Sequence, residues 1–207
     1  MSAYETINIL DMIEIVGEDG TKAILSDFSY PKNSEIDNFI KKNAIEFAKK
    51  KMSITHLVMD EKGQLAAIFT LTHKAVKIRD DVLSSSQRRK IRRYAQLDEV
   101  TNSYMVSAFL IAQLGKNYAE REGEAVIGNS LLDNAMDVLT AVQRDVGGGV
   151  VYLECEDKPQ LLRFYQNAVR PGFVICHLCL LRVLRFVMCT LPSFRGYSNS
   201  ILRRWGE

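Results

Sequence analysis

The sequence lacks a large excess of charge of either sign. Its 207 residues carry 27 Lys and Arg against 25 Asp and Glu, a formal net charge of +2. Because proteins that bind nucleic acid through their whole surface are strongly basic, this balance does not indicate such binding. Hydrophobic residues make up 47% of the chain, which suits one globular domain with a core and room for an appendage.

The sequence also lacks several features that would mark other classes of protein. Its first residues contain no basic segment followed by an apolar run, so we expect no signal peptide and a cytoplasmic location with reduced thiols. It contains no internal repeat and no low-complexity segment. Cys176 and Cys179 have the CxxC spacing of a zinc-ligand pair. A zinc site needs a second pair of ligands, and only Cys189 lies near in the sequence, so no metal is expected.

From Ala168 onward the chain lacks lysine altogether and carries six Arg against one acid, Glu207. We therefore separate a domain over residues 1–167 from an atypical tail over residues 168–207. Three explanations of the tail stay open: an altered gene end such as a frameshift, a divergent but working ending, or a membrane-associating segment. A span is disfavoured because each Arg at the centre of a bilayer, here Arg182 and Arg185, costs about 2.5–3.5 kcal/mol.

Periodicity predicts the elements of the first half. Loose alternation over residues 5–30 favours strands, and residues 31–51 predict a helix with Ser34 as its N-cap. Residues 53–72 predict a hairpin. A polar insert follows over residues 73–100, with a helix from about Ser84 to Tyr94.

The second half alternates strand and helix. Residues 103–118 predict a central strand covered on both faces. Residues 129–146 predict a helix that ends at three glycines, followed by a strand over residues 150–156 and a helix from Pro159. This order predicts an α/β fold with a mixed sheet flanked by helices, and no clear strand pair can be read after Asn167.

Two stretches, AQLGKNYAEREGEAVIGNSLLDNAM and VVYLECEDKPQLLRFYQN, resemble the GNAT superfamily of acetyl-CoA-dependent N-acetyltransferases. Within it, the resemblance is to bacterial members that include toxin-type acetyltransferases. The segment ILSDFSYPKNSEIDNFIKKNA of this chain also resembles the opening of those proteins. It covers residues 24–167. It implies the GNAT fold with a mostly antiparallel sheet, acetyl-CoA as co-substrate, and transfer of the acetyl group to a primary amine without a covalent enzyme intermediate.

In this family a loop between the central strand and the next helix binds the CoA pyrophosphate. Backbone N–H groups and the positive end of the helix dipole suit that role. The family pattern is Gln/Arg-x-x-Gly-x-Gly/Ala; here Gly128 takes the last glycine position, Val126 replaces the first glycine, and Gly123 stands where Gln or Arg is usual. The resemblance therefore implies cofactor contacts from Gly123, Val126, Ile127, Gly128 and Asn129. A plain helix start would also explain Gly128.

The resemblance assigns two further parts of the site. LIAQLGKN resembles the strand end that runs beside the pantetheine and hydrogen-bonds the thioester carbonyl, which implies Leu114, Gly115 and Lys116; a buried strand is the ordinary alternative. Tyr165 matches the Tyr of FYxxxGF, a general acid for the departing CoA thiolate. Packing against the sheet is the alternative for Tyr165.

A general base for the amine is not assigned. Glu154, Glu99 and Asp98 are candidates, directly or through water, and each also suits a solvated surface position.

The partners follow from charge and from the resemblance. The segment QRRKIRRY is a basic run, and such runs ordinarily form a solvated face. Alternatively, its cations would contact an RNA backbone; these are Arg88, Arg89, Lys90, Arg92 and Arg93. The resemblance adds a sub-variant, a toxin that acetylates aminoacyl-tRNA and is neutralised by an antitoxin, and a homodimer is compatible with it. The rival is a catalytically impaired or CoA-binding-only remnant, which Val126 and the tail favour.

Overall fold

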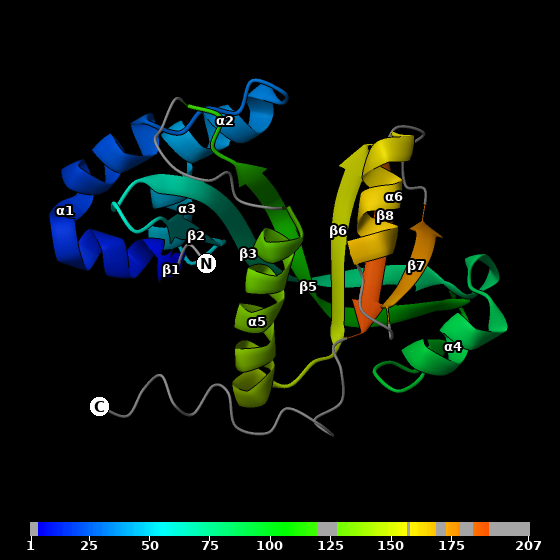
Figure 1. Ribbon diagram of the computed structural model, residues 1–207. Coiled ribbons are helices and arrows are strands. Elements are labelled where there is room, and N and C mark those ends of the chain that lie inside the picture. The colour runs from blue at the N-terminus through cyan, green and yellow to red at the C-terminus, as the bar shows by residue number, and fades with distance from the viewer. Residues whose placement is uncertain (1–3, 120–127, 157, 169–172, 179–183, 191–207) are drawn as a thin grey trace.

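The computed structural model describes residues 4–119, 128–156, 158–168, 173–178 and 184–190 (Figure 1). The helices are α1 (Ile9–Ser26), α2 (Ser34–Lys42), α3 (Ala44–Lys49), α4 (Ser85–Ile91), α5 (Gly128–Val146) and α6 (Pro159–Ala168), with a short 3-10 turn, η1 (Asp80–Val82). The strands are β1 (Glu5–Asn8), β2 (Ile54–Met59), β3 (Leu65–Arg79), β4 (Leu97–Asp98), β5 (Ser103–Lys116), β6 (Val150–Glu156), β7 (Phe173–Leu178) and β8 (Leu184–Thr190).

Within the described residues the strands form one sheet in the order β1-β2-β3-β5-β6-β8-β7, and β4 pairs with β5. Neighbours are antiparallel except β5 and β6, which run parallel. The parallel pair is joined by α5, as a parallel connection requires a crossover. The predicted α/β fold with a mixed, mostly antiparallel sheet is confirmed.

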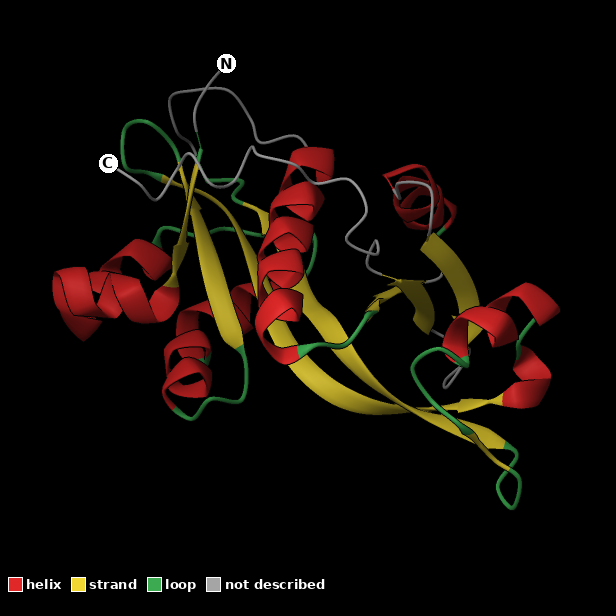
Figure 2. Cartoon of the chain, turned by 90° about the horizontal axis from the view of Figure 1, so that it is seen from below, coloured by secondary structure: helices red, strands yellow, loops and turns green. Residues whose placement is uncertain are grey.

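Helices cover both faces of this sheet (Figure 2). On one face, α5 buries Leu131, Leu132, Ala135 and Leu139 in a core that also contains Phe69, Phe109 and Leu153. On the other face, α1, α2 and α3 enclose a second core that includes Ile9, Phe28, Ile40 and Leu57. A third core lies on that same face under α4. We call these the α5 face and the α1 face.

The segment after Asn8 is a helix, and the prediction of strands there was wrong. The Asn8 side chain caps α1 by accepting a hydrogen bond from the Leu10 N–H at 2.9 Å. Ile9 and Met12 are then buried one turn apart, a spacing that the loose alternation masked. Gly17, with φ of 77°, interrupts the helical dihedral angles and kinks α1.

Two further expectations change in detail. Residues 31–51 form two helices that meet at Asn43, and the N-cap of the first is Asn33 instead of Ser34. The predicted polar insert begins as strand, because β3 continues to Arg79 with Ile78 buried and its neighbours exposed. The helix predicted from Ser84 is confirmed as α4, with Ser84 as its N-cap.

Residues 73–107 form a projection that we call the arm. It consists of the outer halves of β3 and β5 together with η1, α4 and β4 (Figure 2). Helix α4 covers its α1 face, whereas Met105 and Ser107 on the α5 face are exposed. The outer part of β5 is therefore covered on one face, not on both as predicted.

The chain after Asn167 adds two strands to the same sheet. β8 pairs antiparallel with β6 from Leu184 to Thr190, and β7 pairs antiparallel with β8. Sequence inspection revealed no strand pair here. The boundary at Asn167 and the origin of the tail stay predictions. Among the described helices, none is long and apolar enough to cross a membrane.

Candidate active site

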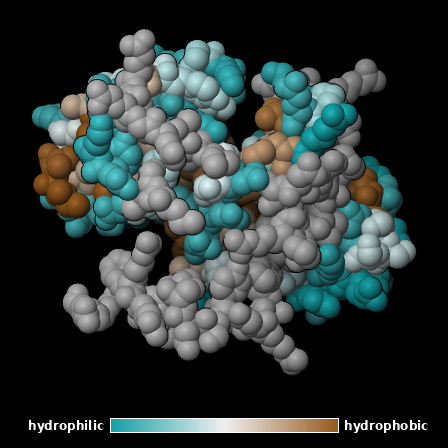
Figure 3. Space-filling view, viewed as in Figure 1, coloured by the Kyte–Doolittle hydropathy of each residue, from teal (hydrophilic) through white to brown (hydrophobic). Residues whose placement is uncertain are grey.

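The central feature of the candidate site is an opening between β5 and β6. The two strands pair only from Ala108 with Val150 to Ile111 with Leu153. Beyond that point β5 continues along β3 to Lys116, and β6 continues along β8 to Glu156. The strands therefore separate in the middle of the sheet, and the surface is notched between the lobe of α1 to α3 and the part that carries α6 (Figures 1 and 3).

A β-bulge lies at the point where the strands separate. Thr70 pairs with Gln113 and Leu71 with Ile111, so Ala112 is an extra residue in β5. Ala112 is exposed although its strand is in the middle of the sheet. Bulges bend the strand that contains them and are common beside active sites. The bulge accounts for the turn of β5 away from β6.

The end of β5 borders the opening and contains three residues that the family resemblance selected. Leu114 packs against the core of the α5 face. Gly115 is buried, and a Cβ on it would lie 3.4 Å from the rings of Phe28 and Tyr30. The Lys116 Cε lies 3.9 Å from where a Gly128 Cβ would be, which brings the end of β5 to the start of α5.

Gly128 is the first residue of α5 and lies directly against α6. A Cβ at this position would be 3.0 Å from the Phe164 ring, which is tighter than most Cβ contacts in proteins. Asn129, the next residue, is exposed. Gly123, Val126 and Ile127, the other predicted phosphate contacts, lie outside the described residues.

Tyr165 extends from α6 into the core of the α5 face, beside the opening. It packs against this core, as Leu114 does, and its ring meets Phe164 edge-on with centroids 4.9 Å apart. Burial raises the pKa of the Tyr165 phenol far above its usual value, and Cys155 and Tyr30 add smaller increases. The hydroxyl is therefore fully protonated near neutral pH, which is the state that a proton donor requires.

The three carboxylates considered as bases occupy different places. Glu154 is exposed on β6, just beyond the last residue paired with β5, and alternation along β6 puts it on the α1 face. Asp98 and Glu99 lie at the turn that leads into β5, about 30 Å along the strand from Ala112. A hydrogen bond from the Thr101 hydroxyl lowers the pKa of Asp98, which gives it a structural role in that turn. Of the three, Glu154 alone borders the opening.

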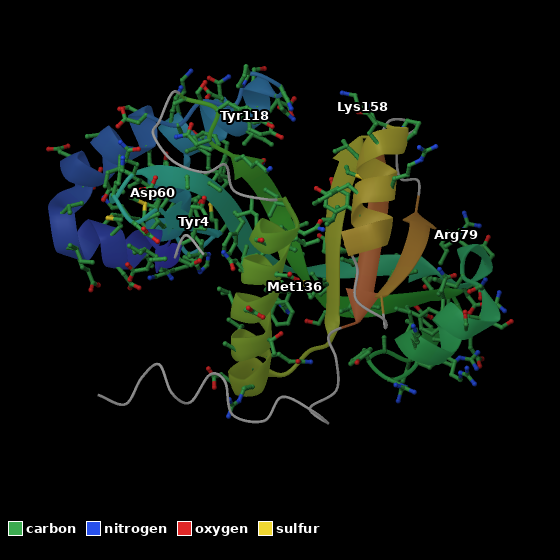
Figure 4. All side chains as sticks on the ribbon, in the orientation of Figure 1. Tyr4, Asp60, Arg79, Tyr118, Met136 and Lys158 are labelled. Atoms are coloured by element: carbon green, nitrogen blue, oxygen red, sulfur yellow. The ribbon has the colours of Figure 1, made fainter. Side chains whose placement is uncertain are left out.

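The structure adds residues that sequence reasoning missed. Tyr30, Asn117 and Tyr118 gather at the end of β5, where Figure 4 shows Tyr118 on the side of the opening opposite Lys158. Tyr30 lies in the loop between α1 and α2, and its ring approaches Gly115 near the end of β5. No local pattern links residue 30 to residue 117, so the sequence carried no signal for this cluster.

No protein-family model and no curated protein matches the sequence. Similar solved structures include AtaT complexed with acetyl-methionyl-tRNAfMet, with a TM-score of 0.62 and 13% identity over 89% of this chain and 95% of that one. They also include a tyrosine-to-phenylalanine mutant of KacT (TM-score 0.60, 14% identity, 89% and 94% covered). A third is AtaTR bound with AcCoA (TM-score 0.56, 12% identity, 92% and 93% covered). The likeness extends over almost the whole of each chain, and together with the separated β5 and β6 it shows that this protein has the GNAT fold of the toxin acetyltransferases.

Proposed function

We propose that this protein is an acyltransferase that moves the acetyl group of acetyl-CoA to a primary amine by direct attack. The observation that carries the proposal is the opening between β5 and β6, with the bulge at Ala112 on one side and the protonated Tyr165 beside it. The fold neighbour bound with AcCoA supports the choice of co-substrate.

The backbone of β5 suits the pantetheine arm of CoA. Beyond Ile111, the edge of β5 that faces β6 has no strand partner among the described residues. Backbone N–H and C=O groups at such an edge bind an extended chain as a further strand would. The amides of the pantetheine would take that place along Leu114, Gly115 and Lys116, and the pyrophosphate would meet the start of α5 at Gly128 and Asn129.

The chemistry then requires two proton movements. The amine nitrogen forms a bond to the thioester carbonyl carbon, and the C–S bond breaks when the tetrahedral intermediate collapses. The CoA thiolate takes the proton of the Tyr165 hydroxyl, which solvent restores. The amine gives its proton to water at the mouth of the opening, where Glu154 would accept it.

Replacing Tyr165 by Phe tests this assignment. General acid catalysis typically contributes 10²- to 10⁴-fold, so we expect acetyl transfer by Tyr165→Phe to fall by about that factor. Acetyl-CoA affinity measured by calorimetry is expected to stay within threefold of the wild type. Tyr94→Phe, on the arm, is the matched control and is expected to keep full activity. Unchanged transfer by Tyr165→Phe would remove the acid role.

The same calorimetry, combined with the transfer assay, distinguishes an active acetyltransferase from the rival, an impaired or CoA-binding-only remnant. A folded wild-type chain that binds acetyl-CoA but acetylates no amine would be a CoA-binding remnant. A folded chain that does not bind acetyl-CoA would be an impaired one. Binding together with transfer would exclude both alternatives.

Aminoacyl-tRNA is the acceptor that a second observation favours. Arg89 on α4 and Arg93 in the turn that follows it are exposed, and neither has a side-chain ion pair among the described residues. Arg88 instead pairs with Asp80 at 3.1 Å, and Arg92 donates to the Tyr104 hydroxyl at 3.2 Å, so these two hold the arm together. One fold neighbour is a complex with an acetylated aminoacyl-tRNA.

The remaining partners belong to the same proposal. Fold neighbours have been solved with the C-terminus of an antitoxin and, for KacTA, with DNA. An antitoxin for this chain, a homodimer and a location in the cytoplasm, where acetyl-CoA and charged tRNA are found, remain predictions.

A further inference from the structure

The loop between α1 and α2 is tied to the end of β5 by a single side chain, Asn117. Its Oδ1 accepts hydrogen bonds from the Ser29 N–H at 2.9 Å and from the Ala119 N–H at 3.0 Å. Its Nδ2 donates to the carbonyl oxygens of Asp27 at 3.1 Å and Leu65 at 2.8 Å. An Asn side chain offers two acceptor positions and two donor hydrogens, so every one is used.

Other hydrogen bonds hold the same loop in place. The Tyr118 N–H donates to the Ser29 carbonyl oxygen at 2.8 Å, and the Tyr30 N–H donates to Asp37 Oδ1 at 3.1 Å. The loop is thus fixed on both sides of Ser29. Since backbone fixed in this way positions its side chains before any ligand arrives, the place of the Tyr30 ring is set in advance.

The Tyr30 ring lies at the opening on the α1 face. It is parallel to Phe28, with centroids 6.3 Å apart, and meets Tyr118 edge-on at 5.4 Å. Two of its carbon atoms lie 3.4 Å from the position that a Gly115 Cβ would take. Gly115 thus brings the ring against the backbone of β5, close to where the thioester would lie.

The two faces divide the site into a cofactor side and an acceptor side. Gly128, Phe164 and Tyr165 lie on the α5 face, where the proposed CoA would enter and leave. Tyr30 lies on the α1 face, where it packs against the core of that face and against Gly115 of β5. An amine that attacks the thioester has to come from the side that CoA does not fill, which is the side of Tyr30.

We propose that Tyr30 selects the acceptor by contacting the group beside the attacked amine, and that Asn117 is the positioning residue that holds Tyr30 there. This inference rests on the acetyl transfer proposed above. The aromatic wall favours an amine next to a flat or apolar group. Lys32, whose Nζ lies 4.7 Å from the centroid of the Tyr118 ring, disfavours acceptors with several positive charges.

The experiment compares the wild type with Tyr30→Ala, Tyr30→Phe and Asn117→Asp. The acceptors are glycinamide, methioninamide, phenylalaninamide, spermidine, and tRNAs charged with glycine or methionine. Initial rates give the acceptor KM and kcat, and calorimetry gives the acetyl-CoA Kd. Asn38→Asp, an exposed position on α2, is the matched control for the change at Asn117.

We expect the wild type to prefer the larger apolar amides and to use spermidine least. Tyr30→Ala is expected to raise the KM for those amides at least tenfold and to abolish the preference over glycinamide, with the acetyl-CoA Kd within twofold. Tyr30→Phe is expected to keep the preference. Asn117→Asp loses both donors and places a charge beside two carbonyl oxygens, so it is expected to raise the same KM by a similar factor, whereas Asn38→Asp is neutral.

The contrary outcomes are distinct. A wild type that binds acetyl-CoA but acetylates none of these acceptors would overturn the proposed function and this inference with it. An active Tyr30→Ala enzyme that keeps its preference, or that loses acetyl-CoA affinity instead, would overturn the inference alone. If Asn117→Asp does not fold, as judged by its thermal transition, the two Tyr30 variants still decide the selecting role.

Discussion

At the scale of single residues, Gly128 shows that one position can have two reasons to be glycine. The family resemblance implies a place in the phosphate loop, where the backbone would have to approach the cofactor closely. The structure adds packing, because the Phe164 ring lies 3.0 Å from where a Cβ would stand. Phe164 neighbours Tyr165, so a side chain at position 128 would require the Phe164 ring, next to the proposed acid, to shift by a few tenths of an ångström.

His56 is the other residue whose environment has a measurable consequence. It lies on β2, buried and stacked on Phe69 with centroids 4.8 Å apart, and its Nδ1 has no hydrogen-bond partner among the described residues. Burial lowers the pKa of His56 to about 4. The folded protein therefore holds a neutral imidazole where the unfolded chain would take up a proton.

We predict that His56 makes the protein less stable as the pH falls from about 6.5 towards 4. In that range the unfolded state binds the proton and the folded state does not, so the stability is complete above pH 6.5 and declines below it. The difference of pKa corresponds to about 3 kcal/mol. Urea unfolding of the wild type and of His56→Phe at pH 7.5 and 4.5 measures this loss of unfolding free energy.

The comparison with His56→Phe removes the contribution of the carboxylates, which titrate in both proteins. His73→Phe, at an exposed position on the arm, is the control and is expected to follow the wild type. Equal pH dependence of the wild type and His56→Phe would contradict the prediction.

At the scale of elements, the first turn of α2 begins one residue earlier than predicted, with Asn33 and not Ser34 as the N-cap. The Asn33 side chain accepts hydrogen bonds from the Glu35 N–H at 2.9 Å and the Ile36 N–H at 3.4 Å. Ser34 is exposed and lies inside the helix. Both residue types are common N-caps, so the sequence alone did not decide between adjacent positions.

We predict that Asn33→Ala lowers the free energy of unfolding by about 1 kcal/mol, because it removes the cap. Ser34→Ala is expected to change it by less than about 0.5 kcal/mol, as is usual for exposed positions. Urea unfolding of the two variants measures both values. The opposite ranking would restore Ser34 as the cap.

At the scale of the whole molecule, the net charge of +2 hides a basic projection. The arm carries Arg89 and Arg93, whose side chains are exposed. The backbone of an RNA lying along the arm would meet these two cations, whereas a small amine bound in the opening would not need them.

We predict that the double variant Arg89→Gln, Arg93→Gln weakens tRNA binding and makes the salt dependence of log K shallower by about 1 to 2, roughly one for each lost phosphate contact. Acetyl-CoA affinity and stability are expected to stay the same. Lys42→Gln with Lys62→Gln removes the same charge elsewhere and is expected to have a small effect. A double variant whose tRNA affinity and salt dependence equal those of the wild type would contradict RNA binding at the arm.

Local patterns in the sequence were enough to predict several elements of the fold. The order of β5, α5, β6 and α6 follows from apolar runs and helical spacing within each segment. Gly128 and Tyr165 were predicted as site residues because they stand at fixed distances from those elements, and these roles stay predictions. The α/β class and the GNAT resemblance rest on the same signals, and the fold neighbours agree with them.

Only the tertiary structure decided the features that join distant segments. The opening depends on where β5 stops pairing with β6, and the Tyr30 wall depends on a hydrogen bond between residues 88 positions apart, Ser29 and Asn117. Strand pairing after Asn167 is of the same kind, since strand preference depends on the neighbours that a sheet supplies. Local periodicity carries no information about such partners, which is why the sequence did not predict that Tyr30 lies against the end of β5.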